Sequence, residues 1–339
     1  MAASHPARPA GQSDRARGAL LGLAVGDALG TTLEFTRRDA LPLHTEMTGG
    51  GPFKLRAGQW TDDTAMALAL ADSLLTCGTL DPADLMARFV AWWREGTYSC
   101  TGTCFDIGMT TAQALGSYEA GGAMYAGSTD PRTAGNGSLM RLAPVALFAL
   151  DDPWAADRIA RDQGRTTHGA SEAVEACAYF VQILRAAILG EGDVLRACAW
   201  IGPDCDPLFP RIWKSDERDH LTLHPTAEAR TIEAIAQGSW RVGARDRIRS
   251  SGYVIDTLEA ALWAVGTTDS FEAALIKAVN LADDADTVGA VTGQLAGALY
   301  GLSAIPERWL SPLAWSAKIQ TCADRLTVKR WPEAGHGTR

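Results

Sequence analysis

Two Asp-rich clusters carry the strongest chemical signal in this sequence. Residues 61–64 read TDDT and residues 283–287 read DDADT, and each cluster directly precedes an apolar, helix-forming run. A helix start needs one carboxylate as a cap, so capping would explain either cluster alone. Together they supply the several charged oxygen ligands that a pair of hard divalent cations requires. Neither contains His or Cys, so the sequence predicts Mg²⁺ or Mn²⁺ rather than Zn²⁺.

Two further acids, Asp27 and Glu34, would share one face of a continuous helix. Apolar residues surround them, including Leu29, Leu33 and Phe35. A solvated acidic face is one interpretation. The other is an acid in a semi-apolar setting beside the cations, where a carboxyl group can act as a general acid or base.

A glycine-rich turn and two isolated side chains are weaker candidates for ligand binding. Residues 135–138 read GNGS before a predicted helix, where backbone N–H groups can bind an anion, although a plain turn explains the pattern equally well. His168 follows two threonines near a predicted helix start and is either structural or part of a site. Tyr253 either packs in the core or stacks on a ligand.

Helical periodicity dominates the segments that must position these residues. The N-cap Asp81 and the following Pro82 predict one helix start. Sustained alternation of apolar and polar β-formers is hard to find, so the predicted fold class is all-α, an orthogonal bundle of many helices. Apolar spacing predicts further helices over residues 62–77, 106–120, 138–149, 153–163, 169–189, 225–238, 251–265, 270–281 and 287–300.

Glycine recurs every four residues in two segments, at 18, 22, 26 and 30 and again at 289, 293, 297 and 301. Each glycine costs about 0.5–1 kcal/mol of helix propensity relative to alanine, so such a stripe indicates close helix approach. We predict that both helices lie at the centre of one bundle; small residues in an Ala-rich chain are the simpler alternative. Their pairing would close a single domain over residues 15–330, with a disordered tail at 1–14 and a C-terminal tail at 331–339.

Composition excludes several classes of protein. The 339 residues are 47% hydrophobic and 21% charged, which is typical of a globular protein rather than a disordered one. The net charge of −9 argues against nucleic-acid or anionic-membrane partners, and no run is long and apolar enough to span a membrane. The seven cysteines form no C-x-x-C pair and indicate reduced thiols. We expect a cytoplasmic monomer.

Four motifs in a fixed order resemble those of a known family. GALLGLAVGDALGTTLEF, WTDDT, GNGSLMRLAP and NLADDADTVGAVTGQLAGALYG, between residues 18 and 301, resemble the ADP-ribosylglycohydrolases. The stretch GTCFDIG at 102–108 is similar to the bacterial branch that includes dinitrogenase reductase-activating glycohydrolase, which removes ADP-ribose from arginine. The resemblance implies an all-α bundle with two divalent cations, Mg²⁺ or Mn²⁺. It also implies hydrolysis of the bond between ADP-ribose and arginine on an ADP-ribosylated protein.

The same resemblance assigns roles to individual residues. The family's metal-ligand positions fall on Thr61, Asp62, Asp63, Asp284, Asp286 and Thr287. Its catalytic acids fall on Glu34 and, in the nitrogenase-linked branch, Asp106, and which of the two carries the proton stays open. Substrate binding, including that of the pyrophosphate, is expected from Gly135, Asn136, Gly137, Ser138, His168 and Tyr253. The family commonly has glycine where Asp283 stands, so Asp283 is not counted as a ligand.

Two other functions stay open at the level of the sequence. The same metal and ribose machinery would serve a hydrolase of O-linked (serine-linked) or small-molecule ADP-ribose, because only the leaving-group pocket would differ. A different class is an immunity or interaction protein that binds an ADP-ribosylating toxin. In that case residues 200–225, which contain several prolines and are predicted to form a long surface loop, would matter more than the cations.

Overall fold

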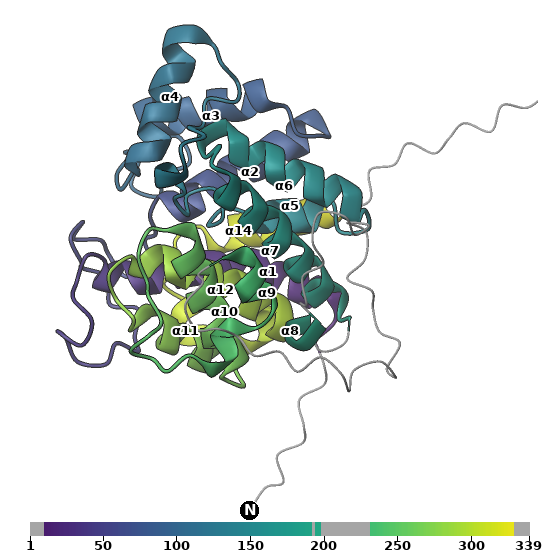
Figure 1. The fold of residues 1–339 in the computed structure, drawn as a ribbon. Helices are drawn as coiled ribbons and strands as arrows, with labels where there is room; N and C mark the ends of the chain where they lie inside the picture. Colours follow the sequence, from purple (N-terminus) through teal and green to yellow (C-terminus); the bar gives the residue numbers. More distant parts are fainter. Residues whose placement is uncertain (1–9, 192–193, 198–230, 329–339) are drawn as a thin grey trace, which may run out of the picture.

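The computed structural model describes residues 10–191, 194–197 and 231–328 (Figure 1). Strand-like pairing within these residues is limited to four isolated bridges, so the predicted all-α class is confirmed. The helices are α1 (Gln12–Gly30), α2 (Asp62–Cys77), α3 (Pro82–Glu95), α4 (Met109–Gly121), α5 (Ala143–Phe148), α6 (Pro153–Thr167), α7 (Ser171–Leu189), α8 (Val194–Ala197), α9 (Ile232–Ala236), α10 (Val254–Gly266), α11 (Phe271–Val279), α12 (Ala285–Tyr300), α13 (Glu307–Leu310) and α14 (Ser316–Thr327).

The two glycine stripes face each other across an antiparallel helix pair, as predicted. A Cβ atom built on Gly22 would lie 2.2 Å from the carbonyl oxygen of Gly293, and one built on Gly26 would lie 2.0 Å from that of Gly289. Backbone therefore touches backbone with no room for a side chain. Figure 1 shows α1 and α12, from opposite ends of the sequence, together inside the bundle.

The ends of the stripes depart from the glycine pattern. Gly30 lies against Ala285 rather than against another glycine, with a built Cβ atom 2.1 Å from the Ala285 carbonyl oxygen. Gly301 ends α12 in a left-handed conformation, with a φ angle of 84°, which glycine adopts without strain. The last member of the second stripe is thus a helix terminator.

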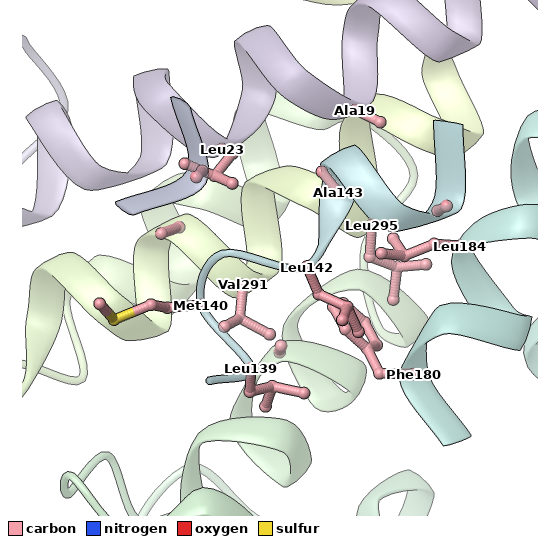
Figure 2. Close-up of a cluster of buried hydrophobic side chains, with 14 of the residues drawn as sticks. Ala19, Leu23, Leu139, Met140, Leu142, Ala143, Phe180, Leu184, Val291 and Leu295 are labelled. Carbon is pink, nitrogen blue, oxygen red and sulfur yellow. The ribbon is translucent and has the colours of Figure 1, made fainter. Parts of the chain in front are cut away.

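Side chains from several helices pack around the paired glycine helices. Figure 2 shows one part of this core, where α1, α12, α7 and the segment entering α5 meet. The labelled side chains, each at most 2% exposed, are Ala19, Leu23, Leu139, Met140, Leu142, Ala143, Phe180, Leu184, Val291 and Leu295. The pairing of α1 with α12 is consequently fixed from both sides by apolar burial.

Three predicted boundaries need correction. The predicted helix over 138–149 is shorter, because α5 begins at Ala143, one residue before Pro144, and proline is tolerated in the first helical turn but not in the interior. The helix predicted from residue 106 begins at Met109, so Asp106 lies before α4. The predicted tail over 1–14 is wrong for residues 12–14, since α1 begins at Gln12 and Asp14 accepts hydrogen bonds from Ser303.

Other sequence predictions concern bonding and membrane insertion. Cysteines 77, 100, 104, 177 and 322 are free thiols. No helix in the described part of the chain combines the length and apolar character needed to cross a membrane. The loop predicted over 200–225 lies outside the described residues.

Candidate metal centre and active site

The start of α2 is capped from α1 rather than by its own side chains. Asp27 Oδ2 accepts hydrogen bonds from the Thr64 backbone N–H (3.0 Å) and hydroxyl (2.6 Å). Its Oδ1 accepts from the backbone N–H (2.8 Å) and hydroxyl (2.9 Å) of Thr61. Thr61, the residue at the N-cap position, makes no side-chain cap of its own. Asp62 and Asp63 are therefore not needed for capping.

The start of α12 is capped in the same way, by Glu34. The Glu34 Oε2 atom accepts hydrogen bonds from the backbone N–H groups of Ala285 (2.7 Å) and Asp286 (3.3 Å). Glu34 is 3% exposed and follows the 3-10 turn η1 (Thr31–Leu33) at the end of α1. Asp286 Oδ1 accepts one first-turn N–H, that of Thr287, while the carboxylate of Asp284 accepts none from this helix start, so capping alone does not explain either Asp-rich cluster.

Asp286 lies at the centre of the acidic site. It belongs to three sets of three carboxylates: Asp27–Asp63–Asp286, Glu34–Asp284–Asp286 and Asp62–Asp106–Asp286. Within each set, one oxygen from each residue lies within 4.8 Å of the others. All four predicted aspartate ligands are thus brought together with both predicted catalytic acids, Glu34 and Asp106.

The two predicted threonine ligands adjoin these carboxylates. The Thr61 hydroxyl lies 3.1 Å from Asp63 Oδ2 and 3.2 Å from Asp286 Oδ2. Thr287 donates its backbone N–H to Asp286 Oδ1 at 2.7 Å, and a hydrogen bond from its side chain lowers the pKa of Asp284. Both threonines are almost fully buried, so their hydroxyl groups are held at the acidic site.

The electrostatics of the site are unfavourable without a cation. Burial, followed by repulsion from Asp286, raises the pKa of Asp27 and of Asp284 to about 7 and that of Asp106 to about 11. The same causes raise the pKa of Asp62, Asp63 and Glu34 well above their usual range. Among the described residues, none of the ion pairs involves these carboxylates.

Two buried carboxylate oxygens at this site have no hydrogen-bond partner among the described residues. They are Asp63 Oδ1 and Asp106 Oδ2. Unpartnered buried acceptors are rare, and each is expected to have a ligand or solvent partner. The donor set is all oxygen and carries several charges, so it fits hard divalent cations such as Mg²⁺ or Mn²⁺.

The 135–138 turn contacts the acidic site through its asparagine. Asn136 Nδ2 donates to Asp284 Oδ2 at 2.5 Å and to the Thr257 hydroxyl at 2.8 Å. Ser138 is fully buried and accepts a weak hydrogen bond from the Cys177 thiol, so its hydroxyl lies in the core rather than at the site. The expectation that this turn leads directly into a helix is wrong, because α5 begins at Ala143.

His168 and Tyr253 lie on either side of the same turn. A Cβ atom built on Gly137 would lie 2.7 Å from His168 Cε1, so the ring packs directly against this glycine. Burial, with a smaller contribution from Arg141, lowers the pKa of His168 to about 3, which keeps the ring neutral. Tyr253 pairs with Gly135 through a backbone bridge and donates its hydroxyl to Glu172 at 2.8 Å.

Asp283 is set apart from the other aspartates. It is exposed and has a φ angle of 66°, in the left-handed region that favours glycine and tolerates aspartate. Its backbone accepts a hydrogen bond from the Phe35 N–H at 2.7 Å and donates to the Thr36 carbonyl at 3.0 Å. This backbone conformation is one that glycine would adopt without strain.

Sequence analysis missed Arg141, a fully buried residue behind the 135–138 turn. Its guanidinium donates to the carbonyl oxygens of Gly137 (3.0 Å) and Gln163 (2.9 Å) and to the Thr167 hydroxyl (3.0 Å). It therefore ties the turn to the end of α6, next to His168. In the sequence, Arg141 is a single arginine inside the apolar run LMRLAPVALFAL, and an arginine in such a run is expected to be paired with polar groups.

Comparisons with known proteins identify a family for the chain. The family model described as ADP-ribosylglycohydrolase matches residues 8–334. The chain is 45% identical to ADP-ribosylarginine hydrolase Tri1 of Pseudomonas putida (strain GB-1), covering 92% of this chain and 78% of that protein. It is 36% identical to the dinitrogen reductase ADP-ribosyl glycohydrolase of Rhodospirillum rubrum, covering 88% and 90%.

A solved ADP-ribosylglycohydrolase-related protein complex has the same architecture. It superposes with a TM-score of 0.75 at 41% sequence identity, covering 93% of this chain and 98% of that one. The match extends over nearly the whole length of both chains. On this agreement of sequence and fold, the chain belongs to the ADP-ribosylglycohydrolase family.

Proposed function

We propose that this protein hydrolyses the N-glycosidic bond between ADP-ribose and arginine on mono-ADP-ribosylated proteins and requires two divalent cations. The observation that carries the proposal is that Asp286 belongs to three sets of buried or half-buried carboxylates. It is supported by the 45% identity of the chain to an ADP-ribosylarginine hydrolase. The cations would be held by Thr61, Asp62, Asp63, Asp284, Asp286 and Thr287. When bound, such cations would attract the ribose hydroxyls as oxygen ligands and would make a nearby water more acidic.

Asp106 is the proposed proton carrier on the arginine side. Cleavage at the ribose carbon passes through an oxocarbenium-like state, and the arginine nitrogen leaves more readily when it is protonated. Asp106 lies before α4, half-buried, and its buried Oδ2 atom has no hydrogen-bond partner among the described residues. That oxygen is free to hold a proton and transfer it to the leaving nitrogen.

Glu34 is better suited to orienting the site than to proton transfer. Its Oε2 atom is already engaged by two backbone N–H groups of α12, one of them from Asp286. A carboxylate that caps a helix in this way is held in one orientation. Glu34 therefore positions the Asp286 segment and, with it, the ribose or the attacking water.

The ADP portion of the substrate is assigned to the side of the 135–138 turn. Asn136 orients Asp284, and Arg141 and His168 support the two glycines from behind. The backbone N–H groups of Gly137 and Ser138 would then face the pyrophosphate, since those of Gly135 and Asn136 donate to backbone carbonyl oxygens, while Tyr253 is placed to flank the adenosine. Ser138 contributes only its backbone, since its side chain lies in the core.

The test compares linkages and metals directly. Purified protein is incubated with arginine-linked and serine-linked ADP-ribosyl peptides in Mg²⁺, in Mn²⁺ and in excess chelator, and released ADP-ribose is quantified. We expect turnover of the arginine-linked peptide that depends on added metal. Preference for the serine-linked peptide would replace the arginine assignment, and full activity in chelator would refute the role of the cations.

A further inference from the structure

Three phenylalanines form a continuous row beside the acidic site. The rings of Phe35 and Phe53 lie 6.2 Å apart, centroid to centroid, in an edge-to-face arrangement, and those of Phe53 and Phe105 lie 5.2 Å apart. Phe53 comes from a loop that is anchored to the end of α1, since the Thr32 hydroxyl donates to the Gly49 carbonyl at 3.0 Å. We call Phe35, Phe53 and Phe105 the phenylalanine row.

Both ends of the phenylalanine row are covalently next to a proposed functional acid. Phe35 directly follows Glu34, and Phe105 directly precedes Asp106. Glu34 and Asp106 each lie within a carboxylate group that includes Asp286. The two ends of the row are therefore attached next to two acids of the same site.

Phe35 is unusual in both exposure and conformation. Its side chain is 67% exposed, and its φ angle of 58° lies in the left-handed region, a genuine outlier for a bulky residue. The hydrogen bond from its N–H to the Asp283 carbonyl, at 2.7 Å, holds this backbone in place. Strained, exposed residues of this kind cluster at ligand-binding sites.

The phenylalanine row has no cation over its rings among the described residues. Several other aromatic rings in the described part of the chain do have one: Phe89, Trp93, Trp240, Trp263, Trp309 and Trp315 each have a Lys or Arg side chain over the ring. The row is thus available for a cation supplied by a ligand.

We propose that the phenylalanine row binds the guanidinium group of the substrate arginine; this inference rests on the proposed function. A guanidinium is planar and cationic, stacks on aromatic faces and is attracted by neighbouring carboxylates. The 135–138 turn meets the acidic site at Asp284, through Asn136, whereas Phe105 is next to Asp106, and Asp284 and Asp106 fall in different carboxylate groups around Asp286. The two ends of the substrate would therefore lie on different sides of the site, with the arginine beside the proton carrier Asp106.

The test separates the arginine side of the substrate from its ADP-ribose side. Affinities for ADP-ribosyl-agmatine and for ADP-ribose are measured by calorimetry on an Asp106→Asn background, which is expected to slow turnover about 10²–10⁴-fold, with and without Phe35→Leu. We expect Phe35→Leu to weaken binding of the agmatine conjugate by about 2-fold to 30-fold, the range of a cation–aromatic contact. Affinity for ADP-ribose should not change, and Phe35→Trp should retain binding of the conjugate.

The matched control is Trp154→Ala, which removes an aromatic side chain that is 46% exposed at the opposite end of α6 from His168. It should alter neither affinity. Equal weakening for both ligands in Phe35→Leu would show that the ring serves the ADP-ribose portion and would overturn the inference, as would unchanged affinity for both.

Failure of the proposed function has a different signature. It would appear as absent turnover of the arginine-linked peptide by the wild-type protein. Failure of the present inference would appear as normal wild-type turnover with an unchanged KM for that peptide in Phe35→Leu. Thermal melting of each variant confirms that the fold is intact.

Discussion

Substitution of Gly293 by alanine tests the packing that assembles the site. A Cβ atom at this position would lie 1.9 Å from the Gly22 carbonyl oxygen and 2.6 Å from its carbonyl carbon. Favourable contacts between heavy atoms begin at about 3.5 Å, so α1 and α12 would have to separate by more than about 1 Å. Neither contacting group is a flexible side chain, which leaves backbone movement as the only relief.

The magnitude follows from two opposing effects. Overpacking a core costs about 1–3 kcal/mol, and contact between two backbones belongs at or above the upper end of that range. Alanine recovers about 0.5–1 kcal/mol of helix propensity. We expect a net loss of about 2–3 kcal/mol in the free energy of unfolding, or roughly 4–12 °C in Tm at 2–4 °C per kcal/mol.

The assay is thermal unfolding followed by circular dichroism in excess chelator, so that packing is measured apart from cation binding. Gly116→Ala is the matched control, because Gly116 lies within α4 and a Cβ atom there would meet nothing within 4 Å. The control should melt slightly higher than wild type, by propensity alone. A Gly293→Ala protein that melts at or above the wild-type temperature would refute the backbone contact between the two helices.

Three further predictions concern the acidic site. Asp284→Ala and Asp286→Ala should abolish turnover and remove the rise in Tm caused by Mg²⁺ or Mn²⁺, because cation binding stabilises the native state by mass action. A metal-induced rise in Tm that persists in either variant would contradict the ligand assignment. Asp106→Asn should keep the metal-induced rise in Tm and the binding of ADP-ribose but lose about 10²–10⁴-fold in single-turnover rate. Glu34→Gln should lose rate and also impair the metal-induced rise in Tm or the binding of ADP-ribose. The reverse pattern would exchange the two roles. In chelator the free energy of unfolding should fall as pH rises from about 4 to 7. Burial raises the pKa of Asp27 and Asp284 to about 7, so the folded state binds more protons than the unfolded state in this range. Urea titrations at pH 5 and pH 7 measure the sign of the change.

Local sequence patterns determined most of the helices because the signals act over a few residues. Asp81, Asp152 and Ser270 each accept hydrogen bonds from backbone N–H groups of the helix that follows, as their residue types favour. The boundary error at α5 also had a local cause. Pro144 could not occupy the interior of a helix that began at residue 138, so its position already indicated a later start.

The clusters of aspartates and the glycine stripes were likewise visible in the sequence, because each is a short pattern with a direct chemical or steric meaning. The stripes predicted a close helix pair, and the structure places them in contact with backbone on backbone. Their pairing requires the ends of the chain to meet. It was therefore a long-range contact that local spacing could predict.

Only the tertiary structure could distinguish a cap from a ligand at the two Asp-rich helix starts. Asp27 and Glu34 cap α2 and α12 from outside, and this releases the local carboxylates to surround Asp286. A sequence pattern records which acids are near a helix start but not which acid from a distant segment accepts its N–H groups. The same holds for the phenylalanine row, because Phe35 and Phe53 lie between η1 and α2 while Phe105 lies between α3 and α4, and these two connections meet only in the folded chain.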